Sequence, residues 1–288
     1  ANRNSIDMML AVNGIPVVAI ELKNQLTGQS VDDAMRQWEY NRNPKEYAFG
    51  FNKRVLAYFA CDLYNVYMTT QLNGAETVFL PFNQGSNGAG KDGGAGNPTT
   101  EDGKYVTSYF WENVLQKDKL LDILQKFISY EGSEKKKIMP DGSTKTTVSS
   151  KVIFPRYHQL DVVRKLVSHV RENGAGHNYL IQHSAGSGKS NSIAWTAYRM
   201  ASLHDENNNP IFDSVIIVTD RRVLDQQLQA TVSGFDHTLG SVVTIDEKKN
   251  SGDLRDAIND GKRIIISTLQ KFPVIYDEVH SSVGKHYA

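Results

Sequence analysis

The sequence is poor in cysteine, in net charge and in long apolar runs. Cys61 is the single cysteine among 288 residues, which excludes an internal disulfide and is typical of a reducing compartment. Because Cys61 lies in an apolar stretch, we expect a small buried side chain and not a nucleophile. No apolar run approaches the ~18 residues of a membrane span, and residues 1–10 lack the pattern of a signal peptide. We therefore expect a cytoplasmic protein with no membrane association.

The charge balance does not indicate a partner. Thirty-two Lys and Arg residues match 32 Asp and Glu residues, so any contact with DNA must come from local clusters. Hydrophobic residues make up 40% and charged residues 22% of the chain, which excludes a fibrous or wholly disordered protein. The length is typical of two domains.

Two stretches rich in turn-forming residues divide the chain. Residues 84–103 are rich in Gly, Asn and Asp and predict a mobile loop. Residues 130–150 contain three consecutive lysines and a Pro-Asp-Gly turn, which predict an interdomain linker or an exposed hairpin. We therefore expect a first domain over about 1–130, a linker over 131–151 and a second domain over 152–288.

Hydrophobic periodicity predicts an α/β fold in both domains. In the first domain it predicts strands at 6–12, 15–22, 54–60 and 64–70 and helices at 30–41 and 107–129. Ser30 is the expected N-cap of the helix at 30–41. In the second domain, helices at 157–171, 189–204, 221–230 and 252–259 alternate with strands at 178–182, 214–219, 241–245 and 263–268. This alternation predicts a parallel sheet covered by helices.

The strongest motif is HSAGSGKS, residues 183–190, between a predicted buried strand and a helix. Gly186 and Gly188 would let main-chain N–H groups wrap an anion at the start of the helix. Lys189 would reach the β- and γ-phosphates of ATP, and the hydroxyl of Ser190 would hold Mg²⁺. His183 departs from the usual pattern, which begins with glycine. The predicted nucleotide-binding residues of this loop are Ser184, Ala185, Gly186, Ser187, Gly188, Lys189 and Ser190.

Other polar residues of the second domain fit an ATP-driven motor. The amide of Gln159, about 25 residues before the loop, could pair with adenine, although a helical Gln is usually solvated. Arg221 follows the strand at 214–219, and Gln270 and Lys271 follow the strand at 263–268. Open parallel sheets bind ligands at these strand ends. Arginine at a helix start opposes the helix dipole, which favours a phosphate contact over a merely exposed position.

Asp277-Glu278-Val279-His280 resembles the acidic box of such motors. A parallel strand before it would need a crossover of about a dozen residues, and none fits between Thr268 and Val274. We therefore expect the true box beyond residue 288.

Two acids and a lysine near the N-terminus suit phosphodiester hydrolysis. Glu21 and Lys23 share one face of the strand at 15–22, and Asp7 lies in the preceding strand. Asp7 and Glu21 would hold Mg²⁺ with the Leu22 carbonyl as a further ligand, and Lys23 would orient or deprotonate the attacking water. Asp-x13-Glu-x-Lys is by itself a loose pattern, and an ordinary hairpin with a surface Glu–Lys pair is the alternative.

The register of the first hairpin tests this interpretation. A two-residue turn at Asn13-Gly14 pairs Val12 with Ile15, which would put Asp7 and Glu21 on opposite faces. A three-residue loop or a β-bulge would restore a common face, and the nuclease hypothesis requires one of these. On the next helix, Gln37 and Tyr40 could touch a DNA backbone, although a solvated helix face is at least as good an interpretation.

In this order, the motifs resemble those of the restriction (R, HsdR-type) subunit of type I restriction-modification enzymes. They are Asp7, Glu21-Leu-Lys23, Pro81-Phe-Asn83, the helix at 107–128, HSAGSGKS and STLQKF. The resemblance implies a PD-(D/E)xK nuclease domain followed by a partial RecA-like motor domain of superfamily 2 helicase type. It also implies Mg²⁺ and ATP as cofactors, with double-stranded DNA and the methyltransferase and specificity subunits as partners.

Position by position, the resemblance implies roles for particular residues. Asp7, Glu21 and Lys23 match the nuclease motif, residues 184–190 match the phosphate loop, and Gln159 matches an adenine-contacting glutamine. The DNA-facing residues that we predict from the sequence and the resemblance are Gln37, Tyr40, Arg221, Gln270 and Lys271. Gln37 to Tyr40 is one residue shorter than the family's Gln-x-x-x-Tyr motif. Because the acidic box and a second RecA-like domain are missing, we expect a fragment that binds ATP poorly and does not turn it over.

Two alternatives to this assignment stay open. The chain could belong to a repair or phage-defence helicase–nuclease that is not coupled to methylation. It could also be a DNA-binding scaffold whose nuclease acids are inactive.

Overall fold

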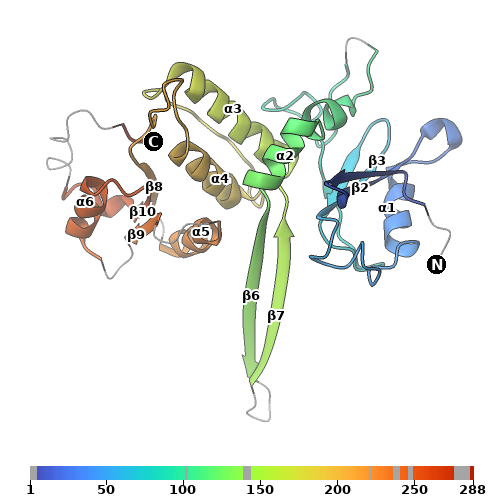
Figure 1. Cartoon of the computed structure of the whole chain (residues 1–288), viewed down its shortest axis with the longest axis horizontal. Helices are drawn as coiled ribbons and strands as arrows, with labels where there is room; N and C mark the ends of the chain where they lie inside the picture. Colours follow the sequence, from blue (N-terminus) through green and yellow to red (C-terminus); the bar gives the residue numbers. More distant parts are fainter. Residues whose placement is uncertain are drawn as a thin grey trace. The chain divides into compact units, whose positions relative to one another are not determined.

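A computed structural model describes residues 5–100, 103–138, 144–220, 222–235, 241–245, 249–275 and 286–288 (Figure 1). The chain forms two compact units, Ala1–His158 and Gln159–Ala288, and each combines helices with strands. No helix of the described ranges is long and apolar enough to cross a membrane.

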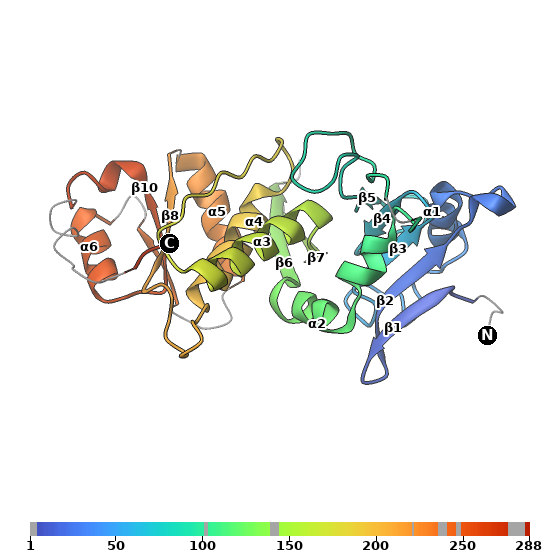
Figure 2. The same ribbon diagram turned by 90° about the horizontal axis from the view of Figure 1, so that it is seen from above.

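The first unit contains a five-stranded mixed sheet with the strand order β1-β2-β3-β4-β5 (Figures 1 and 2). Its strands are β1 (Met8–Val12), β2 (Ile15–Leu22), β3 (Ala57–Cys61), β4 (Val66–Thr69) and β5 (Leu80–Pro81). β2 and β3 pair in parallel, and the other neighbours pair antiparallel. The parallel pair requires a crossover, and helix α1 (Val31–Tyr40) lies within it, after the short 3₁₀ helix η1 (Gln25–Thr27).

Local hydrogen bonds start α1 where the sequence predicts. The main-chain N–H of Ser30 donates to the Asp33 carboxylate at 2.8 Å, as in a capping box. Val31 N–H donates to the buried Asp62 carboxylate at 2.9 Å, which ties the helix start to the end of β3. The indole of Trp38 donates to the Phe59 carbonyl at 2.9 Å, so α1 is also fixed along its length.

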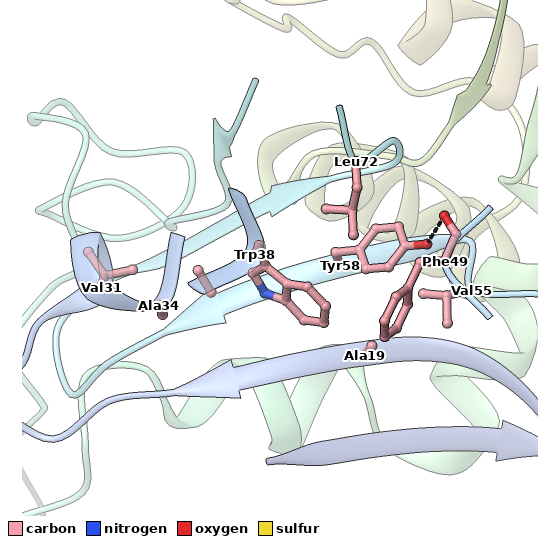
Figure 3. Packing of buried hydrophobic residues seen from close by; sticks show 9 residues of the cluster. Ala19, Val31, Ala34, Trp38, Phe49, Val55, Tyr58 and Leu72 are labelled. Atoms are coloured by element: carbon pink, nitrogen blue, oxygen red, sulfur yellow. Dashed lines mark hydrogen bonds between the residues drawn. The ribbon is translucent and has the colours of Figure 1, made fainter. Parts of the chain in front are cut away.

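The side chains between α1 and the sheet form a continuous core (Figure 3). Trp38 and Tyr58 meet edge to face with ring centroids 5.2 Å apart, a favourable aromatic geometry. The Tyr58 hydroxyl donates to the Phe49 carbonyl at 3.0 Å. The core comprises Ala19, Val31, Ala34, Trp38, Phe49, Val55, Tyr58, Ala60 and Leu72. This packing fixes α1 against β2, the strand that carries Glu21.

An aromatic cluster around Phe59 and Phe82, which also includes Phe110 and Phe154, forms a second core.

The single helix expected at 107–129 is wrong. Its residues form a π-helix, η2 (Phe110–Val114), and helix α2 (Lys117–Lys126), which starts where the Gln116 side chain accepts a bond from Lys119 N–H. Cys61 is 3% exposed, which confirms a buried thiol, and burial raises its pKa to about 12.

The two stretches rich in turn-forming residues, 84–103 and 130–150, both contain defined main-chain hydrogen bonds. Within residues 84–103, Gly85 N–H donates to the Gly96 carbonyl and Ser86 N–H to the Gly94 carbonyl, so the base of this loop is held. Its mobility stays a prediction. Strands β6 (Ser129–Ile138) and β7 (Thr144–Ile153) form an antiparallel ribbon (Figure 1), so the hairpin interpretation of the 130–150 stretch is confirmed.

The second unit has a parallel sheet of order β8-β10-β9, as the alternation predicts. Its strands are β8 (Val215–Thr219), β9 (Val242–Ile245) and β10 (Ile264–Thr268), with the 3₁₀ helix η3 (Leu269–Lys271) after β10. Helices α4 (Lys189–Ala201), α5 (Arg222–Gly234) and α6 (Ser251–Asn259) belong to this unit, and α3 (Tyr157–Asn173) starts two residues before it.

The strand expected at 178–182 is wrong. Residues 178–182 are irregular, and the Leu180 side chain is 95% exposed. A strand needs a hydrogen-bonded neighbour, and within the described ranges no strand pairs with this segment. Local apolar character alone therefore does not make it a strand.

Candidate functional site

A β-bulge sets the register of the first hairpin. Val12 pairs with Ile15 across a two-residue turn, in which Asn13 and Gly14 both have positive φ. The register then shifts, because Ala11 pairs with Pro16 but Leu10 with Val18, which leaves Val17 as the extra residue. Proline has no N–H for the ladder and is found at bulges. Pro16 is therefore the signal in the sequence that could have predicted this bulge.

The bulge brings the two acids to one face of the hairpin. Met8 pairs with Ile20, so the next position outward sets Asp7 opposite Glu21. The Asp7 carboxylate accepts a hydrogen bond of 2.8 Å from Leu22 N–H, directly beside Glu21. The condition that the nuclease hypothesis places on the register is met.

Glu21 is fully buried, and one of its oxygens has no hydrogen-bond donor among the described residues. Oε1 accepts bonds from Arg42, whereas Oε2 accepts none. Burial raises the pKa of the Glu21 carboxyl to about 7, against the lowering effect of Arg42, and the neighbouring Asp7 carboxylate raises it further. A buried oxygen without a donor is energetically costly, and a cation would supply the missing partner.

Lys23 extends the site toward α1. Its ammonium donates to the side-chain oxygen of Gln37 at 2.5 Å, and both side chains are half-buried. Gln37 therefore binds another predicted site residue. Tyr40, at the end of the helix, is 68% exposed.

Arg42 is the residue that sequence reasoning missed. It lies two residues after α1, is 5% exposed and forms an ion pair with Glu21. Nothing in the local sequence distinguishes it from other arginines near helix ends. Its role depends on the packing of α1 against β2.

The residues present fit a hard divalent cation. Asp7 and Glu21 offer carboxylate oxygens, the ligands that Mg²⁺ prefers. Within the described part of the chain, no three His, Cys, Asp or Glu side chains gather. A cation here would therefore complete its shell with main-chain and water oxygens.

The predicted phosphate loop of the second unit leads into helix α4 through two glycines with positive φ. Gly186 has φ +72° and Gly188 has φ +80°, values that side chains disfavour, and Gly188 is the N-cap of α4. The Lys189 ammonium donates to the carbonyls of Ser184 (2.9 Å) and His183 (3.3 Å). Ser187 is buried, whereas Ser184 and Ala185 are exposed and Ser190 is half-buried.

Gln159 lies beside this loop. Its side chain is buried, and its amide nitrogen donates to the Gly188 carbonyl at 2.9 Å. The structure thus brings Gln159, on α3, together with the N-cap of α4.

The predicted DNA-facing residues of this unit differ in their surroundings. Thr219 and Thr268 are register partners, so β8 and β10 end together, and Gln270 is exposed just beyond. The Lys271 ammonium donates to the carbonyls of Ile245 (2.8 Å) and Lys249 (2.9 Å). Arg221 and the sequence at 277–280 lie outside the described residues.

Two family models match the chain. Residues 1–84 match the "Type I restriction enzyme R protein N terminus" family, and residues 158–286 match the "SWI2/SNF2 ATPase" family. No solved structure matches.

Curated relatives carry names that agree with the first of these families. The chain is 25% identical over 235 residues to a Methanocaldococcus jannaschii protein named as the type I restriction enzyme MjaVIIIP endonuclease subunit, covering 77% of the chain and 19% of the relative. It is 24% identical over 283 residues to the type I restriction enzyme HindI endonuclease subunit of Haemophilus influenzae, covering 94% and 24%. The chain thus spans about a fifth to a quarter of their length. Together, the N-terminal family match and these relatives support an HsdR-type, or restriction, subunit of a type I restriction enzyme.

Proposed function

We propose that the first unit is a metal-dependent DNA endonuclease of the PD-(D/E)xK type and that the second is the ATP-binding part of a DNA translocase. Together they would serve a cytoplasmic type I restriction enzyme that cuts unmodified foreign DNA. The observation that carries this proposal is the bulged hairpin, which sets Asp7 opposite Glu21 and leaves a buried carboxylate oxygen without a donor.

In the nuclease, Asp7 and Glu21 would hold Mg²⁺. Bound Mg²⁺ makes water a better nucleophile and stabilises charge on the attacked phosphate. Lys23 would orient the attacking water with its ammonium, and Gln37 would hold that ammonium in place through the 2.5 Å bond. Tyr40, exposed on the same helix, would lie against the DNA backbone.

In the motor, residues 184–190 would bind the phosphates of ATP. Lys189 would exchange its two carbonyl partners for phosphate oxygens, which are stronger acceptors. Ser190 would hold Mg²⁺, and Gln159 would link the adenine to the loop through Gly188. Arg221 and Gln270 would face double-stranded DNA, as would Lys271 once released from its carbonyls. The methyltransferase and specificity subunits would be the partners.

The nuclease proposal can be tested in the full-length subunit assembled with those partners. We expect D7A, E21A and K23A each to slow plasmid cleavage by about a hundredfold or more, because each removes a group that acts on the transition state. ATP hydrolysis by the same complexes should not change. D32N, an exposed acid on α1, is the matched control.

The outcomes separate the alternatives. Normal cleavage by the three variants would contradict the proposal and favour a scaffold with inactive acids. Purification of the full-length subunit without a methyltransferase would favour a nuclease that is not coupled to methylation.

A further inference from the structure

Resting on the proposed function, we infer that Arg42 is a positioning residue of the nuclease. It would hold one oxygen of Glu21 so that the other binds the cation. Arg42 itself would touch neither the metal nor the DNA.

The geometry of the ion pair is the first argument. An arginine commonly donates to both oxygens of a carboxylate, one N–H to each. Here Nε, at 2.9 Å, and Nη2 of Arg42 both donate to Oε1 of Glu21. Two donors on one oxygen restrict rotation of the carboxylate and leave Oε2 without a donor among the described residues.

Burial and charge are the second argument. The side chains of Arg42 and Glu21 are 4% and 0% exposed, so each charge depends on the other and not on water. Asp7 lies opposite Glu21 across the hairpin, so two carboxyl groups lie beside the single positive charge of Arg42. A divalent cation between Asp7 and Oε2 would bind both carboxyl groups.

The anchoring of Arg42 is the third argument. Its Nη2 also donates to the Ser5 carbonyl at 2.5 Å, just before Asp7, and its guanidinium carbon lies 5.9 Å from the centre of the Trp38 ring. The Trp38 indole N–H in turn donates a hydrogen bond to the Phe59 carbonyl. Arg42 therefore connects the core under α1, through Trp38, to the Glu21 carboxylate and to the main chain at Ser5.

The experiment measures Mn²⁺ binding by the chain, from the loss of the free-ion signal in electron paramagnetic resonance. Removing a group that orients a metal ligand costs about ten- to a hundredfold in affinity, so we expect R42Q to weaken binding by such a factor. R42K keeps the charge but not the two-donor geometry and should fall between R42Q and wild type. R36Q, which changes an exposed arginine of the same helix, should bind as wild type does.

The controls separate the possible failures. If wild type does not bind Mn²⁺, or if E21Q binds it equally well, the proposed function is wrong and the inference falls with it. If wild type binds and R42Q binds as well or more tightly, Arg42 is a bystander or a competitor of the metal, and only the inference is overturned. Circular dichroism checks that each variant folds. If R42Q does not fold, R42K becomes the test, and an R42K chain that binds Mn²⁺ with wild-type affinity would overturn the inference.

Discussion

Glu21 combines an ionisable carboxyl group with full burial, and burial opposes ionisation in a folded protein. Burial raises its pKa to about 7, from about 4.5 for an exposed glutamate. The folded chain therefore binds this proton more tightly than the unfolded chain does. The stability that follows is present at low pH and is lost as the pH rises from about 4.5 through about 7.

Replacement of Glu21 should reveal this loss. Between pH 4.5 and 7.5, without divalent cations, the free energy of unfolding of wild type should fall by about 3 kcal/mol more than that of E21Q, which has no proton to release. Urea unfolding followed by circular dichroism measures both. E39Q, on α1, should keep the wild-type slope. An E21Q slope equal to that of wild type would mean that Glu21 is not the titrating group.

Gln37 should matter through Lys23. Its oxygen accepts a 2.5 Å bond from the ammonium, and a bond to a charged group contributes about 1.5–3 kcal/mol. We expect Q37A to slow DNA cleavage by about ten- to a hundredfold in the assembled enzyme, with little change in DNA affinity. D32N serves as the control because Asp32 is exposed on the same helix and has no role in the proposed site. If Q37A weakens DNA binding and leaves the cleavage rate at saturation unchanged, Gln37 contacts DNA and does not position Lys23.

Among the elements, the first hairpin determines whether a cation site exists. Its extra residue is Val17. Deletion of Met9 from β1 would set Asp7 opposite Ile20, on the face away from Glu21, since a shift of one residue in register moves a side chain to the other face. We expect the deletion variant to fold, because β1 is an edge strand, and to lose Mn²⁺ binding. M9A keeps the register and should bind. Retained binding in the deletion variant would show that Asp7 is not a ligand.

The elements also show how far sequence reasoning extends. β2 and α1 were predicted to within one residue at each end, because their apolar periodicity and the Ser30 cap are local properties. The expected strand at 178–182 failed because a strand depends on a neighbour far along the chain. The expected helix at 107–129 failed because Gln116 starts a new helix within it. Neither the missing partner of the first segment nor the helix start inside the second can be derived from local composition.

The same limit applied to the site. Asp7, Glu21 and Lys23 stood out because charges at the end of an apolar strand conflict with folding. The bulge left a sequence signal in Pro16, but its effect on the register could not be derived without the sheet. The sequence contains no comparable signal for Arg42, since its ion pair with Glu21 forms only when α1 packs on β2.

At the scale of the whole chain, the two candidate sites lie in different units. The carboxylate pair lies in Ala1–His158, and the predicted phosphate loop lies in Gln159–Ala288. We expect K189A to weaken the binding of a fluorescent ATP analogue by about tenfold or more, because it removes a charged contact to phosphate, without changing Mn²⁺ affinity. E21Q should weaken Mn²⁺ binding without changing the affinity for the ATP analogue. If either substitution changes binding at the other site, the two sites are coupled in the intact chain.

Because Cys61 is buried, its reaction with a thiol reagent can report local unfolding of the first unit. A thiol whose pKa is about 12 is almost wholly protonated at pH 8, and the protonated form does not attack alkylating or disulfide reagents. As the only cysteine in the sequence, it gives one unambiguous labelling signal, and a C61A chain gives the blank. We expect labelling at the rate at which β3 becomes exposed, and Mn²⁺ bound by the folded first unit should slow that rate.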